Sequence, residues 1–179
     1  MKKMSLRKIL LTNRSKATCI EIAHYLSANP AAFKDFFYSL YSSDEQLSAH
    51  AAWVITALTD LYPHLLQERQ ALLLAVLKTV QHNEALRRNT MRFWGKKPID
   101  EKIEGEVYDL GLHYMSADFS IAVKVHAMYA CKKIAFKYPD LLYDFKLHVE
   151  DMQRKYQMNS AGIASACSRV LKEIAKRLK

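Results

Sequence analysis

One pattern in this sequence could do chemistry, a set of basic side chains at helical spacing. Residues three or four apart share a face of an α-helix, and Arg88, Arg92 and Lys96 have that spacing. Two later groups share a face in the same way. The complete set is Arg88, Arg92, Lys96, Lys133, Lys137, Arg169, Lys172 and Lys176. If these cations align on one surface, they form a basic strip of the kind that contacts phosphate groups.

The overall charge leaves two interpretations of these cations open. The chain has 27 Lys and Arg against 18 Asp and Glu, a net charge of +9. The positive charge is concentrated in segments 84–97, 118–137 and 160–179, whereas segment 99–115 is acidic. A basic strip for nucleic acid would have this distribution, but Lys and Arg also cover the solvated faces of ordinary helices. Both interpretations remain hypotheses.

Each of the two tryptophans could be an exposed binding residue or a core residue. Trp94 lies next to Lys96 and Lys97 at the end of a helical pattern. An exposed ring beside cations can stack on a nucleic-acid base, so we include Trp94 among the candidate binding residues; the alternative is a hydrophobic plug at the helix end. Trp53 lies on an apolar helix face, and we expect it in the core.

Catalytic and metal-binding motifs are not found in the sequence. Its seven histidines form no His-Glu-x-x-His motif and no spacing that would join two of them to a cysteine around a metal. Cys131 and Cys167 lie on apolar helical segments, where a thiol is usually an inert core residue. We therefore assign no catalytic residue, no metal ligand and no cofactor.

The composition predicts one cytoplasmic domain. A chain of 179 residues, half of them hydrophobic, is long enough for a single domain with a sizeable core, and we expect that domain to span 1–179. The apolar run Ile9, Leu10 and Leu11 is far shorter than the apolar region of a secretory signal. No window reaches the roughly 20 apolar residues of a membrane span. The three cysteines are odd in number and far apart, which is typical of a cytoplasmic protein whose thiols are reduced.

Prolines divide the chain into short helices. Pro30, Pro63 and Pro139 each follow one helical pattern and precede another, and proline suits the first turn of a helix. Pro98 lies in a looser connection. With four glycines and few β-branched clusters, the composition favours helix and no sheet. The predicted pairs are 17–28 with 31–41, 45–61 with 64–81, 84–94 with 99–115, 119–137 with 139–157, and a final helix 160–178.

The pairs repeat at a regular interval. Ala52, Thr90, Ala127 and Ala166 fall at equivalent points of successive first helices, at spacings of 38, 37 and 39 residues. A period of this length with two helices is typical of an α-solenoid. Helix 119–137 is apolar on several faces, as expected of an inner helix that contacts neighbouring repeats. Because interior glycines weaken a helix, we expect 99–115 to be the least stable.

These repeats resemble a known family. The segments "AHAAWVITALTDLYPHLL" and "IAVKVHAMYACKKIAFKYPDLL" are similar to HEAT repeats, and the resemblance covers residues 17–179. It implies an all-α fold, an α-α superhelix of about four to five helix pairs whose concave surface is lined by second helices. The chain also resembles small bacterial HEAT-like proteins labelled adenylosuccinate lyase. True lyases of that kind have a Ser-Ser-x-Met-Pro loop, whereas Ser42 and Ser43 here precede Asp-Glu-Gln, so we expect no such activity.

Two functions follow as hypotheses. The first is a non-catalytic interaction or scaffold module that binds another protein, because solenoids present extended surfaces and no catalytic set is found. The alternative is a nucleic-acid-binding protein that uses the basic strip. The alkylpurine DNA glycosylases are HEAT-like, so the resemblance also admits a role in DNA repair. An unrelated enzyme remains a third alternative. We expect no membrane association.

Overall fold

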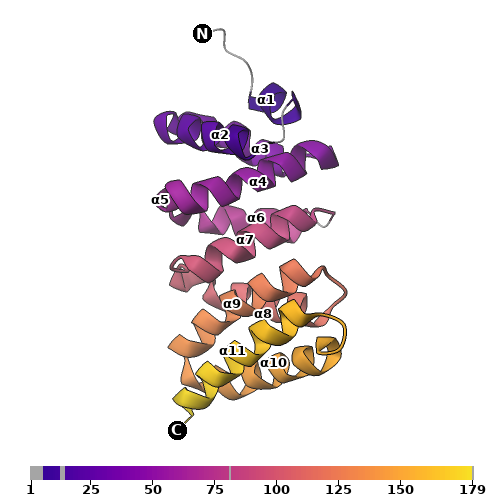
Figure 1. Ribbon diagram of the computed structural model, residues 1–179. Helices are drawn as coiled ribbons and strands as arrows, with labels where there is room; N and C mark the ends of the chain where they lie inside the picture. Colours follow the sequence, from indigo (N-terminus) through magenta and orange to yellow (C-terminus); the bar gives the residue numbers. More distant parts are fainter. Residues whose placement is uncertain (1–5, 13–14, 81, 179) are drawn as a thin grey trace. The chain divides into compact units, whose positions relative to one another are not determined.

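The regular elements of the protein are helices. The computed structural model describes residues 6–12, 15–80 and 82–178, and within these ranges no strand occurs (Figure 1). The all-α prediction is therefore confirmed. Two compact units are present: unit 1 comprises the residues up to Phe93 with Lys97–Asp100, and unit 2 comprises Trp94–Lys96 with Glu101–Lys179. One domain over 1–179 stays a prediction.

The first helix of each pair begins at a side-chain cap. These helices are α2 (Lys16–Ala28), α4 (Glu45–Leu61), α7 (Glu84–Lys96), α9 (Ile121–Lys137) and α11 (Ala161–Arg177). The capping residues are Ser15, Asp44, Asn83, Ser120 and Ser160. Each side-chain oxygen accepts a hydrogen bond from the backbone N–H three residues later, which satisfies a donor that has no partner within the helix.

The second helices begin differently, with a short tight turn. η1 (Pro30–Ala32) leads into α3 (Phe33–Leu40), α5 (Pro63–Gln67) precedes α6 (Gln70–Thr79), η2 (Glu101–Ile103) leads into α8 (Glu104–Ser116), and η3 (Pro139–Leu141) leads into α10 (Leu142–Tyr156). Three of these segments have proline at the first position, where its missing N–H is not needed. The predicted alternation of first and second helices along the chain is confirmed.

Two features of unit 1 differ from the sequence prediction. An additional helix, α1 (Leu6–Thr12), precedes the first predicted pair, and its Leu10 carbonyl contacts Nδ1 of the buried His50 on α4. The predicted helix 64–81 is broken between α5 and α6, where Arg69 has ψ of 21° instead of a helical value. Neither proline nor glycine marks this break, so the sequence carried no signal for it.

Contacts between repeats support the proposed register. In unit 1 the buried Asn89 on α7 donates a hydrogen bond of 2.8 Å to the Ala52 carbonyl on α4, 37 residues earlier. In unit 2 the Cys167 thiol on α11 lies 3.9 Å from the Met128 sulfur on α9, 39 residues earlier. The four register positions of the sequence analysis are all buried: Ala52, Thr90, Ala127 and Ala166. The period of 37 to 39 residues therefore corresponds to one layer of the repeat.

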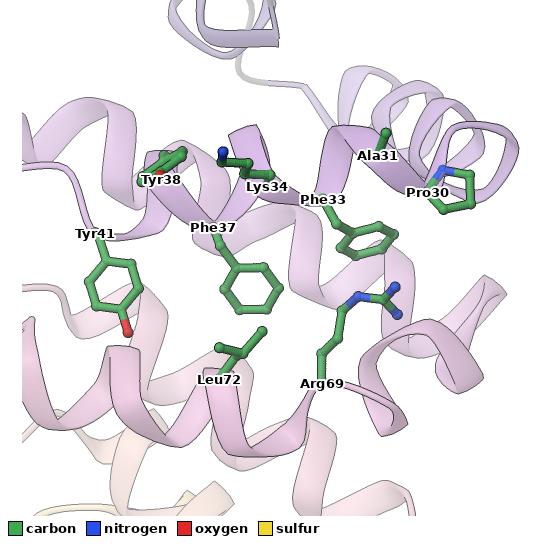
Figure 2. A pocket seen from close by; sticks show the side chains of 9 residues that line it. All are labelled: Pro30, Ala31, Phe33, Lys34, Phe37, Tyr38, Tyr41, Arg69 and Leu72. Atoms are coloured by element: carbon green, nitrogen blue, oxygen red, sulfur yellow. The ribbon is translucent and has the colours of Figure 1, made fainter.

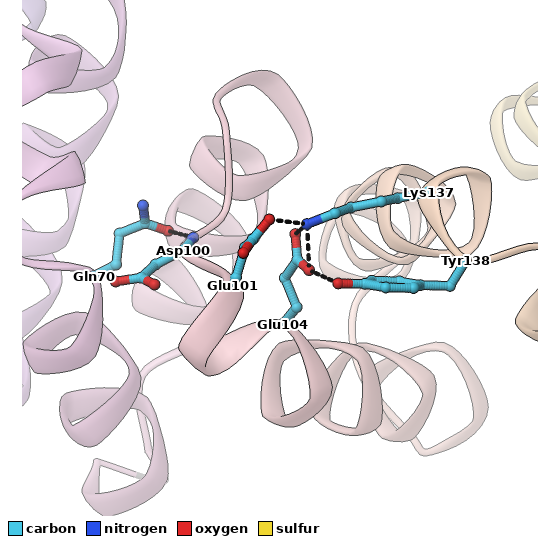
Figure 3. Close-up of polar contacts among 6 residues, drawn as sticks. All are labelled: Gln70, Asp100, Glu101, Glu104, Lys137 and Tyr138. Carbon is cyan, nitrogen blue, oxygen red and sulfur yellow. Dashed lines mark hydrogen bonds and ion pairs between the residues drawn. The ribbon is translucent and has the colours of Figure 1, made fainter.

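A side chain of unit 1 holds the loose connection after α7. The buried Gln70 of α6 donates from Nε2 to the Pro98 carbonyl at 3.3 Å, and its Oε1 accepts from the Asp100 N–H at 3.3 Å. Figure 3 shows the second of these contacts. One amide thus satisfies a donor and an acceptor of a segment that has no regular secondary structure of its own.

The two glycines of α8 have different environments. A Cβ at Gly105 would meet no atom within 4 Å, whereas a Cβ at Gly111 would collide with the Cys131 sulfur and lie 3.6 Å from the Ala127 carbonyl oxygen. Gly111 therefore allows α8 and α9 to approach closely. At Gly111 the packing of unit 2 requires the absence of a side chain. That 99–115 is the least stable helix stays a prediction.

These environments predict opposite effects for the same substitution. Gly105→Ala should raise the free energy of unfolding by about 0.5 kcal/mol or more, because alanine is the better helix former. Gly111→Ala should lower it by about 1–3 kcal/mol, because the methyl group overpacks the interface with Cys131. Urea unfolding followed by circular dichroism measures both changes. Equal effects at the two positions would contradict the close approach of α8 and α9.

Candidate functional site

Trp94 has the environment of its alternative interpretation, a hydrophobic plug, and Trp53 is not in the core. Trp94 is fully buried, so its ring cannot stack on a base, and the proposed role of Trp94 as an exposed aromatic is corrected. Trp53 is 43% exposed, and the Arg88 guanidinium carbon lies 5.5 Å from its ring centroid. Trp53 was expected in the core. On α4 its ring instead lies on the outer surface of unit 1, covered in part by Arg88.

The cations of unit 1 in the candidate strip are already engaged. The Arg92 Nη2 donates to both carboxylate oxygens of Asp60, at 3.2 and 3.0 Å. The Arg88 Nε donates to the Asn89 side chain at 3.3 Å. A guanidinium that shares two hydrogen bonds with a carboxylate has lost most of its attraction for a phosphate. Arg92 is therefore better described as a link between α7 and α4 than as a binding residue.

In unit 2 a similar pairing engages Lys137. Figure 3 shows its Nζ between two carboxylates, 2.7 Å from Glu101 and 3.0 Å from the buried Glu104. The Tyr138 hydroxyl donates a further hydrogen bond of 2.7 Å to Glu104. Glu101 and then Glu104 raise the pKa of Lys137 above its ordinary value. The contribution of Lys137 to stability is therefore present at neutral pH and is lost as the pH rises above the ordinary range of lysine.

The remaining cations of the strip are exposed to different degrees. The Arg169 Nη2 donates to the Tyr129 hydroxyl at 3.3 Å, whereas Lys172 and Lys176 extend from α11 into solvent. Lys133 on α9 is half-buried and Lys96 on α7 is exposed. Arg88 and Arg92 belong to unit 1, and the cations from Lys96 onwards belong to unit 2. A continuous strip across both units stays a prediction.

Metal and thiol chemistry find no support within the described residues. In those ranges no group of three His, Cys, Asp or Glu side chains could hold a metal ion. Burial raises the pKa of the Cys167 thiol to about 11, and burial followed by the nearby Asp109 raises that of Cys131. A raised pKa suppresses the reactive thiolate. Both cysteines are buried in unit 2, as the sequence analysis expected.

A groove in unit 1 is the feature best suited to bind a partner. It lies between the second helices α3 and α6 and has a volume of about 460 Å³ (Figure 2). Phe33 and Phe37 form its floor and are almost fully buried, while the rim is exposed. The apolar rim residues are Tyr38, Tyr41 and Leu72, with exposed fractions of 63%, 38% and 50%. Exposed apolar side chains around a hollow are typical of an interaction site.

The groove also carries positive charge. Lys34 and Arg69 line it, and no carboxylate is among the described residues that do. The Arg69 guanidinium carbon lies 4.4 Å from the Phe33 ring centroid, which holds the side chain against the floor. Its Nη1 donates to the Leu65 carbonyl at 2.8 Å and to Glu68 at 3.0 Å. Lys34 lies over the Tyr38 ring at 5.8 Å.

The sequence analysis did not single out any groove residue. A signal was present in "FKDFFYSL", the eight residues of α3, which contain four aromatic side chains. One buried helix face accommodates Phe33, Phe36 and Phe37, so the remaining ring, Tyr38, must lie outside it. The partner of α3 across the groove could not be foreseen, because Leu72 and Arg69 become neighbours of these rings only through the stacking of repeats.

A comparison with known families agrees with this layered arrangement of helix pairs. The family model of the HEAT repeat domain matches residues 6–174. The chain belongs to the HEAT repeat family. The match begins at α1, so in this HEAT repeat protein it starts further toward the N-terminus than the resemblance over 17–179 implied. No curated protein and no solved structure matches the chain.

Membership of the HEAT repeat family fixes the class of the molecule more than its activity. The all-α helical-repeat fold is confirmed, and the protein is a helical repeat scaffold. The adenylosuccinate lyase label receives no support from the family match. Within the described ranges, no helix has both the length and the apolar character needed to span a membrane.

Proposed function

We propose that this HEAT repeat protein is an interaction module that holds another protein on the second helices of unit 1. The observation that carries the proposal is the groove between α3 and α6, with its buried aromatic floor and exposed apolar rim. Second helices are the surface on which helical repeats commonly present a binding site. Burying the rim against a partner removes apolar area from water, which favours association.

The distribution of charge supports this function over nucleic-acid binding. Arg92 and Lys137, two of the candidate phosphate contacts, form ion pairs within the protein, and Trp94 is buried. Nucleic-acid binding remains the alternative hypothesis, since Lys172 and Lys176 are exposed on α11. It predicts binding to a duplex at about 50 mM salt with a log–log salt slope steeper than about −3, because several phosphates are neutralised.

The test is the loss of a partner from a groove variant. Leu72→Asp places a charge on the exposed rim without disturbing the core. A tagged wild-type protein should retain one stoichiometric protein from a lysate of its own cells, and Leu72→Asp should retain at least about tenfold less, because the apolar contact is lost and a buried charge is costly. Quantitative mass spectrometry of the retained proteins measures the difference.

The matched control is Leu61→Asp. Leu61 is a similarly exposed leucine of unit 1, 45% against 50%, but lies on α4 and does not line the groove. The Leu61→Asp variant should retain the partner at the wild-type level. Equal retention by Leu72→Asp and wild type would contradict the proposed site. The alternative function would be favoured if the wild-type protein retained only nucleic acid and if the double variant Arg169→Glu, Lys172→Glu no longer retained it.

A further inference from the structure

We propose that the segment bound in the groove is acidic and amphipathic, with a carboxylate about one helical turn from an apolar or aromatic anchor. This inference rests on the proposed function and specifies the chemistry of the partner. The apolar anchor packs between Leu72 and Tyr41, and the carboxylate lies toward Arg69, while Lys34 adds positive charge on the α3 side of the groove. A segment of this kind is recognised through its own side chains and needs no folded partner domain.

The apolar half of the site follows from burial. Phe33 and Phe37 form a floor that is already packed, so an incoming side chain finds a rigid apolar surface. In Figure 2, Tyr41 lies at the end of the groove away from Pro30 and Leu72 lies opposite Phe37, and both are exposed. An anchor that packs between them contacts Leu72, Tyr41 and the aromatic floor together. Rigid aromatic floors lose little entropy when they bind, which favours affinity.

The acidic half follows from hydrogen-bonding groups that are unused. Within the described residues, Lys34 has no ion pair, and its only aromatic neighbour is Tyr38 at 5.8 Å. In the described part of the chain, both hydrogen bonds of the Arg69 guanidinium use Nη1, so Nη2 and Nε keep their donors for a ligand. A carboxylate accepts from such donors in charge-assisted hydrogen bonds, which are stronger than neutral ones.

Three other cations among the described residues are paired with carboxylates of the protein itself. Arg92 pairs with Asp60, Lys132 with Glu173 at 2.9 Å, and Lys137 with two glutamates. The groove differs because its two cations have a single carboxylate between them, Glu68, which contacts Arg69 from outside the lining. The groove thus keeps an excess of positive charge beside apolar surface, and an acidic amphipathic segment complements both properties.

Three synthetic peptides test this assignment directly. Each has about 14 residues and the same leucine and phenylalanine anchors at positions i, i+3, i+4 and i+7; the intervening positions are glutamate in the first, glutamine in the second and lysine in the third. Binding to the full chain is measured by fluorescence anisotropy at about 100 mM salt. The glutamate peptide should bind about tenfold more tightly than the glutamine peptide and still more tightly than the lysine peptide.

Two variants with the same charge change locate the effect. Lys34→Glu should weaken the glutamate peptide about three- to tenfold and strengthen the lysine peptide, while Lys16→Glu, an exposed lysine of α2 outside the groove, should change neither. The difference should shrink as salt is added, because the contacts are partly exposed. Equal binding of the three peptides, or equal effects of the two variants, would overturn the acidic specificity.

The outcomes also separate this inference from the proposed function. If Leu72→Asp abolishes binding but the three peptides bind equally, the groove remains the binding site and its acidic preference is wrong. If no peptide binds at about 1 mM and the cellular partner is retained by Leu72→Asp, both are wrong.

A second copy of the chain is a further possible occupant of the groove, since Tyr143 and Leu147 are exposed beside Asp144 on α10. If the protein self-associates and Leu72→Asp abolishes this self-association, the proposal that a different protein occupies the groove is wrong.

Discussion

Met128→Asp is expected to unfold unit 2, with a loss of more than about 3 kcal/mol in the free energy of unfolding. Met128 is fully buried on α9, and its sulfur lies 3.9 Å from the Cys167 thiol on α11. A carboxylate at this position would be removed from water without a partner, which is among the most costly changes in a core. The helical signal at 222 nm, followed through a urea titration, measures the loss.

The control for this prediction is Ile121→Asp on the same helix. Ile121 is 47% exposed in the first turn of α9, so the new carboxylate stays in water near the positive end of the helix dipole. Its free energy of unfolding should change by less than about 0.5 kcal/mol. A Met128→Asp protein with an unchanged melting temperature would show that the repeat register places the wrong face of α9 in the core.

Lys124→Met is expected to destabilise unit 2 by about 2 kcal/mol. Lys124 is almost fully buried, an unusual position for a lysine. Its Nζ donates to the backbone carbonyls of Met115 and Ala117 at the end of α8 and lies 5.5 Å from the Tyr156 ring centroid. The ammonium therefore closes the C-terminus of α8. Methionine fills the space but leaves the buried Met115 carbonyl without this donor, whereas the Ala117 carbonyl still accepts from the Phe119 N–H. An unsatisfied buried acceptor costs about 1–3 kcal/mol.

Lys172→Met makes the same chemical change at an exposed position of α11. It should alter the free energy of unfolding by less than about 0.5 kcal/mol. Thermal unfolding by calorimetry compares the two variants under one set of conditions. If Lys124→Met were as stable as Lys172→Met, the buried ammonium would have no role in closing α8.

The order of helices could be predicted from the sequence because its boundaries have local causes. Ser120 caps α9 through its own side chain, and Pro139 begins the next segment through its fixed backbone angle. These signals act within a few residues of themselves. The break between α5 and α6 has no such signal, because Glu68 and Arg69 are ordinary helix residues. The local sequence therefore did not predict it.

The environment of a single side chain was harder to predict than the helix that carries it. Trp94 lies four residues after Thr90, as Cys131 lies four after Ala127, and both are buried. The repeat register thus contained the signal for Trp94, but its neighbouring lysines suggested an exposed ring. Trp53 lies among small residues of α4, and its exposure depends on Arg88 of α7, 35 residues away in the sequence.

The groove was the least predictable feature, since it is formed by residues from two repeats. Phe37 and Leu72 are 35 residues apart, and neither is unusual in an amphipathic helix. Only the stacking of α3 on α6 turns them into one surface. The charge pattern was misleading for a related reason. Cations such as Arg92 look available in the sequence, whereas their partners, here Asp60, come from another helix.

Site-specific crosslinking tests the central claim most directly, that a partner protein occupies the groove of unit 1. A photoreactive phenylalanine analogue replaces Tyr41 at the rim of the groove, or, as a control, the more exposed Tyr143 on α10 of unit 2. Irradiation in living cells, followed by mass spectrometry, identifies the attached protein. We predict one abundant crosslinked protein from position 41, which is lost when Leu72→Asp is added. The same protein should not be crosslinked from position 143. The same protein attached from position 143 but not from position 41 would contradict it.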